Sequence, residues 1–222
     1  MLRPTATLLI DGPVGPIQTL VDPPDDVRGL AVIAHPHPLL GGANNNKVVY
    51  TLAHTLRDLG HVALRPNFRG VGKSAGTHDF GQGETDDLVA VLDEAIRQWD
   101  PAEALPVVLA GFSFGAFVQA HVAKRLRDTG RATPRLVLVA LAVGEVQGSR
   151  SYQPPPIPSN SILIHGDRDD VVPLTNVVSF AEANHLSVTV VPGADHFFHG
   201  RLNQIRAIVE AAWNGSKAAA VP

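Results

Sequence analysis

The fold is decided by the stretch 106-PVVLAGFSFGAFVQAHVAKRLRD-128. Residues 106–110 have the composition of a buried strand, and residues 116–127 have that of a helix. Between them, 111-GFSFG-115 matches the pattern G-x-S-x-G. The glycines permit a tight turn that lifts the Ser113 oxygen off the end of the strand. This order of strand, turn and helix favours a nucleophilic serine over an ordinary glycine-rich turn.

Strand-like and helix-like segments alternate along the rest of the chain. Apolar runs predict strands, and apolar residues at helical spacing predict amphipathic helices. Doubly apolar strands that alternate with helices predict an α/β fold, in which a mostly parallel sheet is covered by helices on both faces. The predicted strands are 5–10, 15–21, 30–34, 61–66, 106–110, 136–143, 161–165 and 187–191, and the predicted helices are 48–59, 88–99, 114–128, one that starts near 173, and 202–212.

The length favours one domain. We expect a single domain over residues 1–215 and a flexible tail of small residues over 216–222. The hydrophobic fraction of 45% excludes disorder as the overall state. The segment 144–160 contains a run of prolines and is expected to be a loop, too short to be an inserted domain.

Composition also excludes several classes of function. Eighteen basic and 21 acidic residues give a net charge of −3, which argues against a nucleic-acid partner. The chain has no cysteine, so it has no disulfide, no cysteine-ligated metal and no cysteine nucleophile. The longest apolar run, 136–143, is too short to span a bilayer, and the apolar piece 8–10 is too short for a signal peptide. We therefore expect a cytoplasmic protein with no membrane partner.

An acidic loop and a histidine loop follow the serine in the chain. The first is 166-GDRDDVVP-173, directly after the strand 161–165, and the second is 192-PGADHFF-198, directly after the strand 187–191. The carboxyl ends of parallel strands meet at one edge of an open α/β sheet, where catalytic groups gather. We expect both loops to lie at the same edge as Ser113.

These three loops, in this order and spacing, resemble the α/β-hydrolase superfamily, and the resemblance covers nearly the whole chain. The stretch 35-HPHP-38 with Gly41 and Gly42 resembles a branch of small bacterial serine hydrolases related to dienelactone-hydrolase-like esterases. The resemblance implies the α/β-hydrolase fold. It also implies the absence of a lid domain, because only the segment 144–160 stands where many relatives insert one.

The resemblance assigns the catalytic roles by motif register. Ser113 is then the nucleophile, His196 the general base, and Asp169 the residue that orients the imidazole. The alternatives are Asp167 and Asp170 for the acid, which are more typical of turn or capping groups, and His199 for the base.

The same resemblance implies an oxyanion hole and a substrate pocket. One backbone N–H donor is that of Phe114, and the second is that of His37, with Leu39 as the alternative, because Pro36 and Pro38 have no N–H. The expected pocket walls are Leu39, Leu40, Phe112, Tyr152 and Phe197.

The expected function is hydrolysis of small acyl esters through an acyl-enzyme intermediate. Four alternatives stay open: a non-catalytic binding or scaffold protein with the same fold, a thioesterase, a peptidase and an acyltransferase. The expected partner is a small ester, and a homodimer that shades an open site is a further arrangement left open.

Three other features suggest different chemistry but fail in context. The stretch 70-GVGKS-74 resembles a phosphate loop but has Asn67 where that motif needs glycine. The pairs His35/His37 and His196/His199 lack the spacing and the carboxylate of a metal site, so no metal and no cofactor are expected. Arg69 either binds a substrate carboxylate or ties down its loop, and the second role is favoured.

Overall fold

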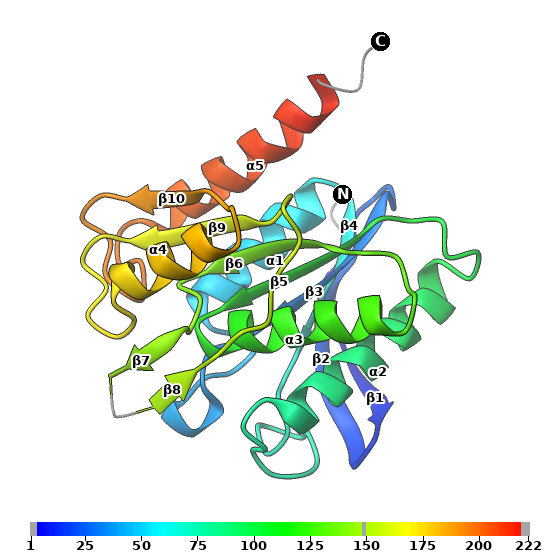
Figure 1. Ribbon diagram of the computed structural model, residues 1–222. Helices are drawn as coiled ribbons and strands as arrows, with labels where there is room; N and C mark the ends of the chain where they lie inside the picture. Colours follow the sequence, from blue (N-terminus) through cyan, green and yellow to red (C-terminus); the bar gives the residue numbers. More distant parts are fainter. Residues whose placement is uncertain (1–3, 148–149, 219–222) are drawn as a thin grey trace.

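An eight-stranded sheet runs through the molecule, with helices on both faces (Figure 1). The computed structural model describes residues 4–147 and 150–218. The strand order is β1-β2-β4-β3-β5-β6-β9-β10; β2 pairs antiparallel with β1 and β4, and every other neighbouring pair is parallel. The strands are β1 (Ala6–Gly12), β2 (Gly15–Asp22), β3 (Gly29–Ala34), β4 (His61–Pro66), β5 (Val107–Phe112), β6 (Arg135–Val139), β9 (Ile162–Gly166) and β10 (Val188–Val191).

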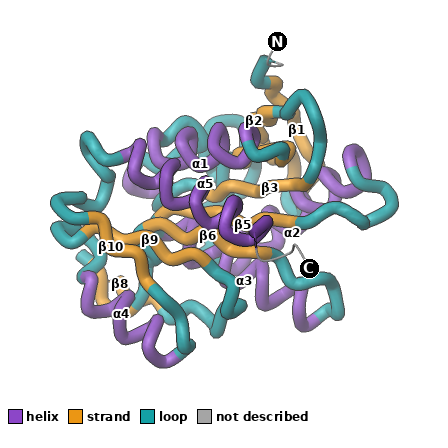
Figure 2. The backbone as a smooth tube through the Cα atoms, turned by 90° about the horizontal axis from the view of Figure 1, so that it is seen from above, coloured by secondary structure: helices purple, strands orange, loops and turns teal. Residues whose placement is uncertain are grey.

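The helices form two layers, one on each side of the sheet. In the view from above, α1 and α5 lie on one face and α2, α3 and α4 on the other (Figure 2). The helices are η1 (Pro38–Leu40), α1 (Lys47–Asp58), α2 (Gln82–Trp99), α3 (Phe114–Asp128), α4 (Leu174–Ala183) and α5 (Leu202–Ala218). No helix in the described ranges combines the length and the apolar character that a bilayer span requires.

The central strands explain why the sheet needs both layers. In β3, Leu30 and Val32 belong to the core cluster under α2 and α3, whereas Ala31 and Ile33 belong to the cluster under α1 and α5. Side chains alternate between the faces of a strand, so a strand with no polar position must be covered on both. The doubly apolar strands of the sequence thus led to the correct fold class.

The structure differs from the sequence prediction at four places. The sixth strand ends at Val139, since Ala140 adopts a positive φ of 46°. Helix α2 begins at Gln82, six residues before Leu88, because its polar first turn is buried. The expected loop 144–160 contains a small hairpin of β7 (Gly144–Val146) and β8 (Arg150–Tyr152). Helix α5 continues through residues 216–218 of the expected tail, and residues 219–222 lie outside the described residues.

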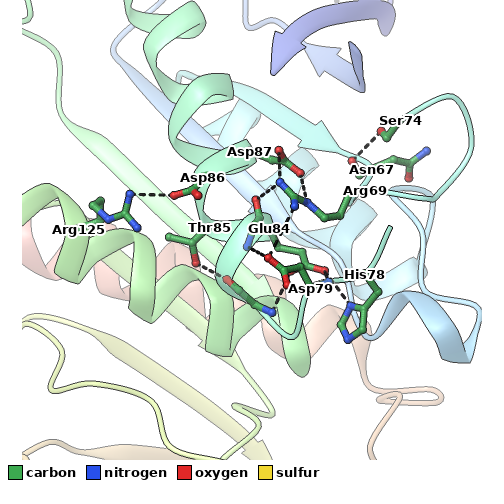
Figure 3. A network of polar contacts seen from close by, with 12 residues as sticks. Asn67, Arg69, Ser74, His78, Asp79, Glu84, Thr85, Asp86, Asp87 and Arg125 are labelled. Atoms are coloured by element: carbon green, nitrogen blue, oxygen red, sulfur yellow. Dashed lines mark hydrogen bonds and ion pairs between the residues drawn. The ribbon is translucent and has the colours of Figure 1, made fainter. Parts of the chain in front are cut away.

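A buried polar network fixes the loop between β4 and α2 (Figure 3). Arg69 donates from Nε to Asp87 Oδ2 and from Nη2 to Asp87 Oδ1, both at 2.8 Å, and also from Nη2 to the carbonyl of Gly83. Both side chains are nearly inaccessible to solvent. Arg69 therefore ties the loop to the first turns of α2, which is the second of its two predicted roles.

The second part of this network surrounds Glu84 (Figure 3). Its fully buried carboxylate accepts the backbone N–H groups of Asp79 and Gly81, each at 2.9 Å, and lies 2.8 Å from Nδ1 of His78. These contacts close the amino end of α2 with a side chain from inside the helix. They also hold His78 and the backbone on either side of Phe80, two residues that reach the site described below.

Replacement of Arg69 tests how much of the stability depends on this network. Arg69→Met leaves the Asp87 carboxylate buried without a counter-charge, so we expect a loss of about 3–5 kcal/mol in the free energy of unfolding, measured by urea titration at pH 7. The double variant Arg69→Met/Asp87→Leu removes the lone charge and should lose less. A double variant no more stable than the single one would contradict this account.

Candidate functional site

The site is built on a strained turn at Ser113, between β5 and α3. Ser113 has φ 56° and ψ −119°, a conformation that non-glycine residues adopt rarely and at a cost in free energy. A Cβ at Gly115 would lie 2.4 Å from the carbonyl oxygen of Ala34, and one at Gly111 would lie 2.6 Å from that of Gly115. Glycine is therefore required at both ends of the motif, and the turn packs directly on the end of β3.

The structure brings Ser113, His196 and Asp169 together from three loops. His196 Nε2 lies 3.1 Å from Ser113 Oγ, and its Nδ1 lies 2.8 Å from Asp169 Oδ2. A carboxylate only accepts hydrogen bonds, so Nδ1 carries the proton and Nε2 is left to accept the Ser113 hydroxyl. His196 is buried, and its ring packs on Phe112 with 5.0 Å between centroids. The imidazole is thus fixed in both tautomer and orientation.

Asp169 is itself held by the loop after β9. Its Oδ1 accepts the backbone N–H groups of Val171 at 2.9 Å and of Val172 at 2.7 Å, which leaves Oδ2 for His196. His165 Nε2 lies 3.5 Å from Oδ2 but is 3.0 Å from the carbonyl of Val172. The Asp169 carboxylate therefore has one oxygen occupied by the backbone and the other directed at His196.

The alternative acids and base lie elsewhere in these loops. Asp167 accepts the backbone N–H of Gly193, and Asp170 is exposed. His199 pairs with Asp195 at the surface, at 2.6 Å. None of these side chains contacts Ser113 or His196 among the described residues.

The sequence predicts two backbone donors at this site, the N–H groups of Phe114 and His37, with Leu39 as the alternative to His37. Phe114 is the first residue of α3, where N–H groups have no partner within the helix, and the positive end of the helix dipole points at the site. Neither the N–H of Phe114 nor that of His37 is engaged by another described residue, and the same holds for Leu39. The three N–H groups, including that of the alternative residue Leu39, are therefore free of hydrogen bonds to other described residues.

Two adjoining cavities lie at this site, and they share lining residues such as His37, Phe114 and Arg150. The first, of about 260 Å³, is lined by Ser113 and His196, and the second, of about 560 Å³, is mainly apolar. Of the expected wall residues, Leu40 and Tyr152 line both cavities, Phe197 the first and Leu39 the second. Phe112 lines neither, because its side chain is fully buried in the core beneath His196.

Sequence reasoning missed several residues that line the cavities. Arg150 borders both, and Val146 and Gln147 of the same hairpin border the first. His78 and Phe80 reach the second cavity from the loop before α2. The sequence carries no motif for these positions, because the hairpin and that loop were expected to be irregular.

Burial changes the ionisation of two groups in these cavities. Burial, together with the nearby positive charge of Arg150, lowers the pKa of His37 to about 4, so this imidazole is neutral at pH 7. Burial raises the pKa of Tyr152, so its hydroxyl stays protonated. Neither of these two side chains therefore carries a charge at pH 7.

The ring nitrogens of His35 are both occupied by backbone groups, so this residue has a structural role and neither nitrogen is free to bind a metal. Its Nε2 accepts the backbone N–H of Phe68 at 2.9 Å, so Nδ1 carries the proton and donates to the carbonyl of Pro36 at 2.7 Å. Burial lowers its pKa to about 4. Among the residues that the structure describes, no group of three or more metal-binding side chains is present.

Comparisons with known proteins find serine hydrolases of the same fold. A family model described as "Serine hydrolase (FSH1)" matches residues 73–200. An α/β serine hydrolase without lid from Xanthomonas campestris is 38% identical, with a TM-score of 0.78 over 96% of this chain and 95% of that chain. An α/β serine hydrolase homologue from Coxiella burnetii is also 38% identical, with a TM-score of 0.77 over 95% of this chain and 99% of that chain. An uncharacterized protein of Rickettsia prowazekii is 34% identical over 176 residues, which cover 76% of this chain and 71% of the relative.

The buried neutral His35 should make stability depend on pH. The unfolded chain protonates this residue near pH 6.5, whereas the folded protein does so only near pH 4. The unfolded state therefore binds more protons between these values, and the free energy of unfolding should fall by about 3 kcal/mol from this residue as the pH is lowered from 6.5 to 4.

Urea titrations across this pH range measure the effect. Compared with the wild type, His35→Gln should be less stable at pH 7 but should lose about 3 kcal/mol less on acidification. His185→Asn, a change at an exposed histidine, is the matched control. Parallel pH profiles for wild type and His35→Gln would refute the assignment.

Proposed function

The chain belongs to the FSH1 serine hydrolase family, and from this premise we propose that it cleaves small carboxylic esters through an acyl-enzyme formed on Ser113. The observation that carries the proposal is the continuous line of hydrogen bonds from Ser113 Oγ through His196 to Asp169, with distances of 3.1 and 2.8 Å. Separations of this size allow a proton to pass from the serine to the histidine as the serine attacks.

In this mechanism His196 transfers the proton in both halves of the reaction. Ser113 Oγ bonds to the ester carbonyl carbon while His196 Nε2 takes its proton, and the carbonyl oxygen becomes an oxyanion. When the oxyanion collapses, the bond to the alcohol breaks and His196 returns the proton to that alcohol. Water then attacks the acyl-enzyme by the same route, which releases the carboxylic acid and restores Ser113. Asp169 stabilises the imidazolium in each half.

The oxyanion is stabilised by donors that are already in place. The backbone N–H groups of Phe114 and His37 have no partner among the described residues, so no hydrogen bond is broken when they bind the oxyanion. Donors held in advance at a helix end lower the barrier because they need no reorganisation.

The size and walls of the cavities favour a small ester. The cavity that contains Ser113 measures about 260 Å³, and a short hairpin, β7–β8, stands where a lid domain would be inserted. Apolar walls with a few fixed polar groups suit a short acyl group. Thioesters and amides would pass through the same acyl-enzyme, and rates on matched ester, thioester and amide substrates separate these reactions.

Removal of the nucleophile tests the proposal. We expect Ser113→Ala to hydrolyse p-nitrophenyl acetate and butyrate at least about 1000-fold more slowly than the wild type, because no acyl-enzyme can form. Ser179→Ala, at an exposed serine of α4, is the control and should keep the wild-type rate. A serine-reactive phosphonate should label the wild type at Ser113. Equal rates in Ser113→Ala and the wild type, or an unlabelled Ser113, would favour a non-catalytic role.

A further inference from the structure

The two adjoining cavities, of which the first contains Ser113, have an unusual balance of charge. No aspartate or glutamate is among the described residues that line them. One lining residue, Arg150, carries a permanent positive charge, and it borders both cavities. A negatively charged ligand therefore meets no carboxylate among these lining residues and is attracted by the charge of Arg150.

Arg150 has no internal counter-ion. None of the ion pairs among the described residues includes it. Its Nη2 donates to the backbone carbonyl of Gln147 at 3.1 Å, and a guanidinium has five N–H donors in all. Arg69 is the opposite case, because Asp87 and Gly83 occupy its donors. Arg150 therefore keeps donors for a ligand.

The hairpin that carries Arg150 is tied to the body of the protein. Val146 of β7 pairs with Arg150 of β8. Asn176 of α4 donates from Nδ2 to the carbonyl of Glu145 at 2.8 Å, and the backbone N–H of Gln147 donates to the carbonyl of Val171 at 2.9 Å. These bonds connect the hairpin to the same loop that holds Asp169. The guanidinium is thus attached to the structure that positions the proton-transfer groups.

From these contacts we propose that Arg150 binds a carboxylate of the substrate, so that the preferred substrates are esters that carry one carboxylate and an apolar group. This inference rests on the proposed function and specifies its substrate class. The planar fork of a guanidinium matches the two oxygens of a carboxylate. A phosphate dianion would call for a second permanent cation, which the described lining residues lack. The apolar group occupies the second cavity, against Leu39, Phe80 and Phe117.

Pairs of esters that differ only in this charge test the proposal. With the carboxylate on the alcohol side, the pair is 3-acetoxybenzoate and 3-acetoxybenzamide. With the carboxylate on the acyl side, it is monomethyl adipate and methyl adipamate. For at least one pair, wild-type kcat/KM should be about 10- to 100-fold higher for the acid than for the amide, as expected for a charge-assisted hydrogen bond.

Variants of Arg150 then test whether this residue causes the preference for the acid over the amide. The ratio of kcat/KM for acid over amide should collapse toward one in Arg150→Gln, be partly retained in Arg150→Lys, and fall below one in Arg150→Glu. Arg28→Gln also removes one positive charge, but it precedes β3 and so lies at the opposite edge of the sheet from Ser113, and it should keep the wild-type ratio. An unchanged ratio in Arg150→Gln, or no preference for the acid of either pair in the wild type, would overturn the proposal.

A binding measurement separates this inference from the catalytic one. Calorimetric titration of Ser113→Ala with the intact esters measures their binding affinity in a protein that cannot form the acyl-enzyme. The acid of the preferred pair should bind about 10- to 100-fold more tightly than the amide, and Ser113→Ala/Arg150→Gln should bind the two equally. Equal affinities in Ser113→Ala would refute the role of Arg150, whether or not the wild type hydrolyses esters.

Discussion

The site depends on one close contact, between the first turn of α3 and the end of β3. The carbonyl oxygen of Ala34 occupies the space that a Cβ at Gly115 would need, so the helix can approach the strand only through glycine. That approach bends the chain sharply at Ser113 and holds it at a positive φ. The strain is sustained by packing on both sides of the turn, and it places the hydroxyl beside His196 and the N–H of Phe114 beside the same space.

Parallel pairing supplies the other half of the arrangement. Strands β5, β9 and β10 end at the same edge of the sheet, so the loops that follow them bring Ser113, Asp169 and His196 together from positions far apart in the chain. The acid loop also uses its own backbone to fix its side chain. The N–H groups of Val171 and Val172 hold Asp169, so the carboxylate stays aimed at the imidazole.

The polar side chains around the site divide into those with partners inside the protein and one without a counter-charge. Arg69 and Glu84 are satisfied inside the protein, and their bonds fix the loop that carries His78 and Phe80 to the second cavity. His35 is also satisfied, by two backbone groups. Arg150 is the exception at the site, since its charge has no partner among the described residues. Satisfied groups stabilise the fold, whereas an unpaired cation in the cavity of Ser113 keeps donors for a ligand.

The sequence by itself determined the fold class, the serine turn and the order of the acid and histidine loops. The first two depend on local chemistry, because doubly apolar strands require two helical layers and glycines permit the turn. The choice of Asp169 over Asp167 came from the resemblance to the α/β hydrolases. Tertiary structure alone decided which side chains face the cavities. Phe112 points into the core although it adjoins Ser113, and Arg150 reaches the site whereas Arg69 does not. The physical reason is that a side chain's direction depends on which distant segment packs beside it, and local composition does not encode that.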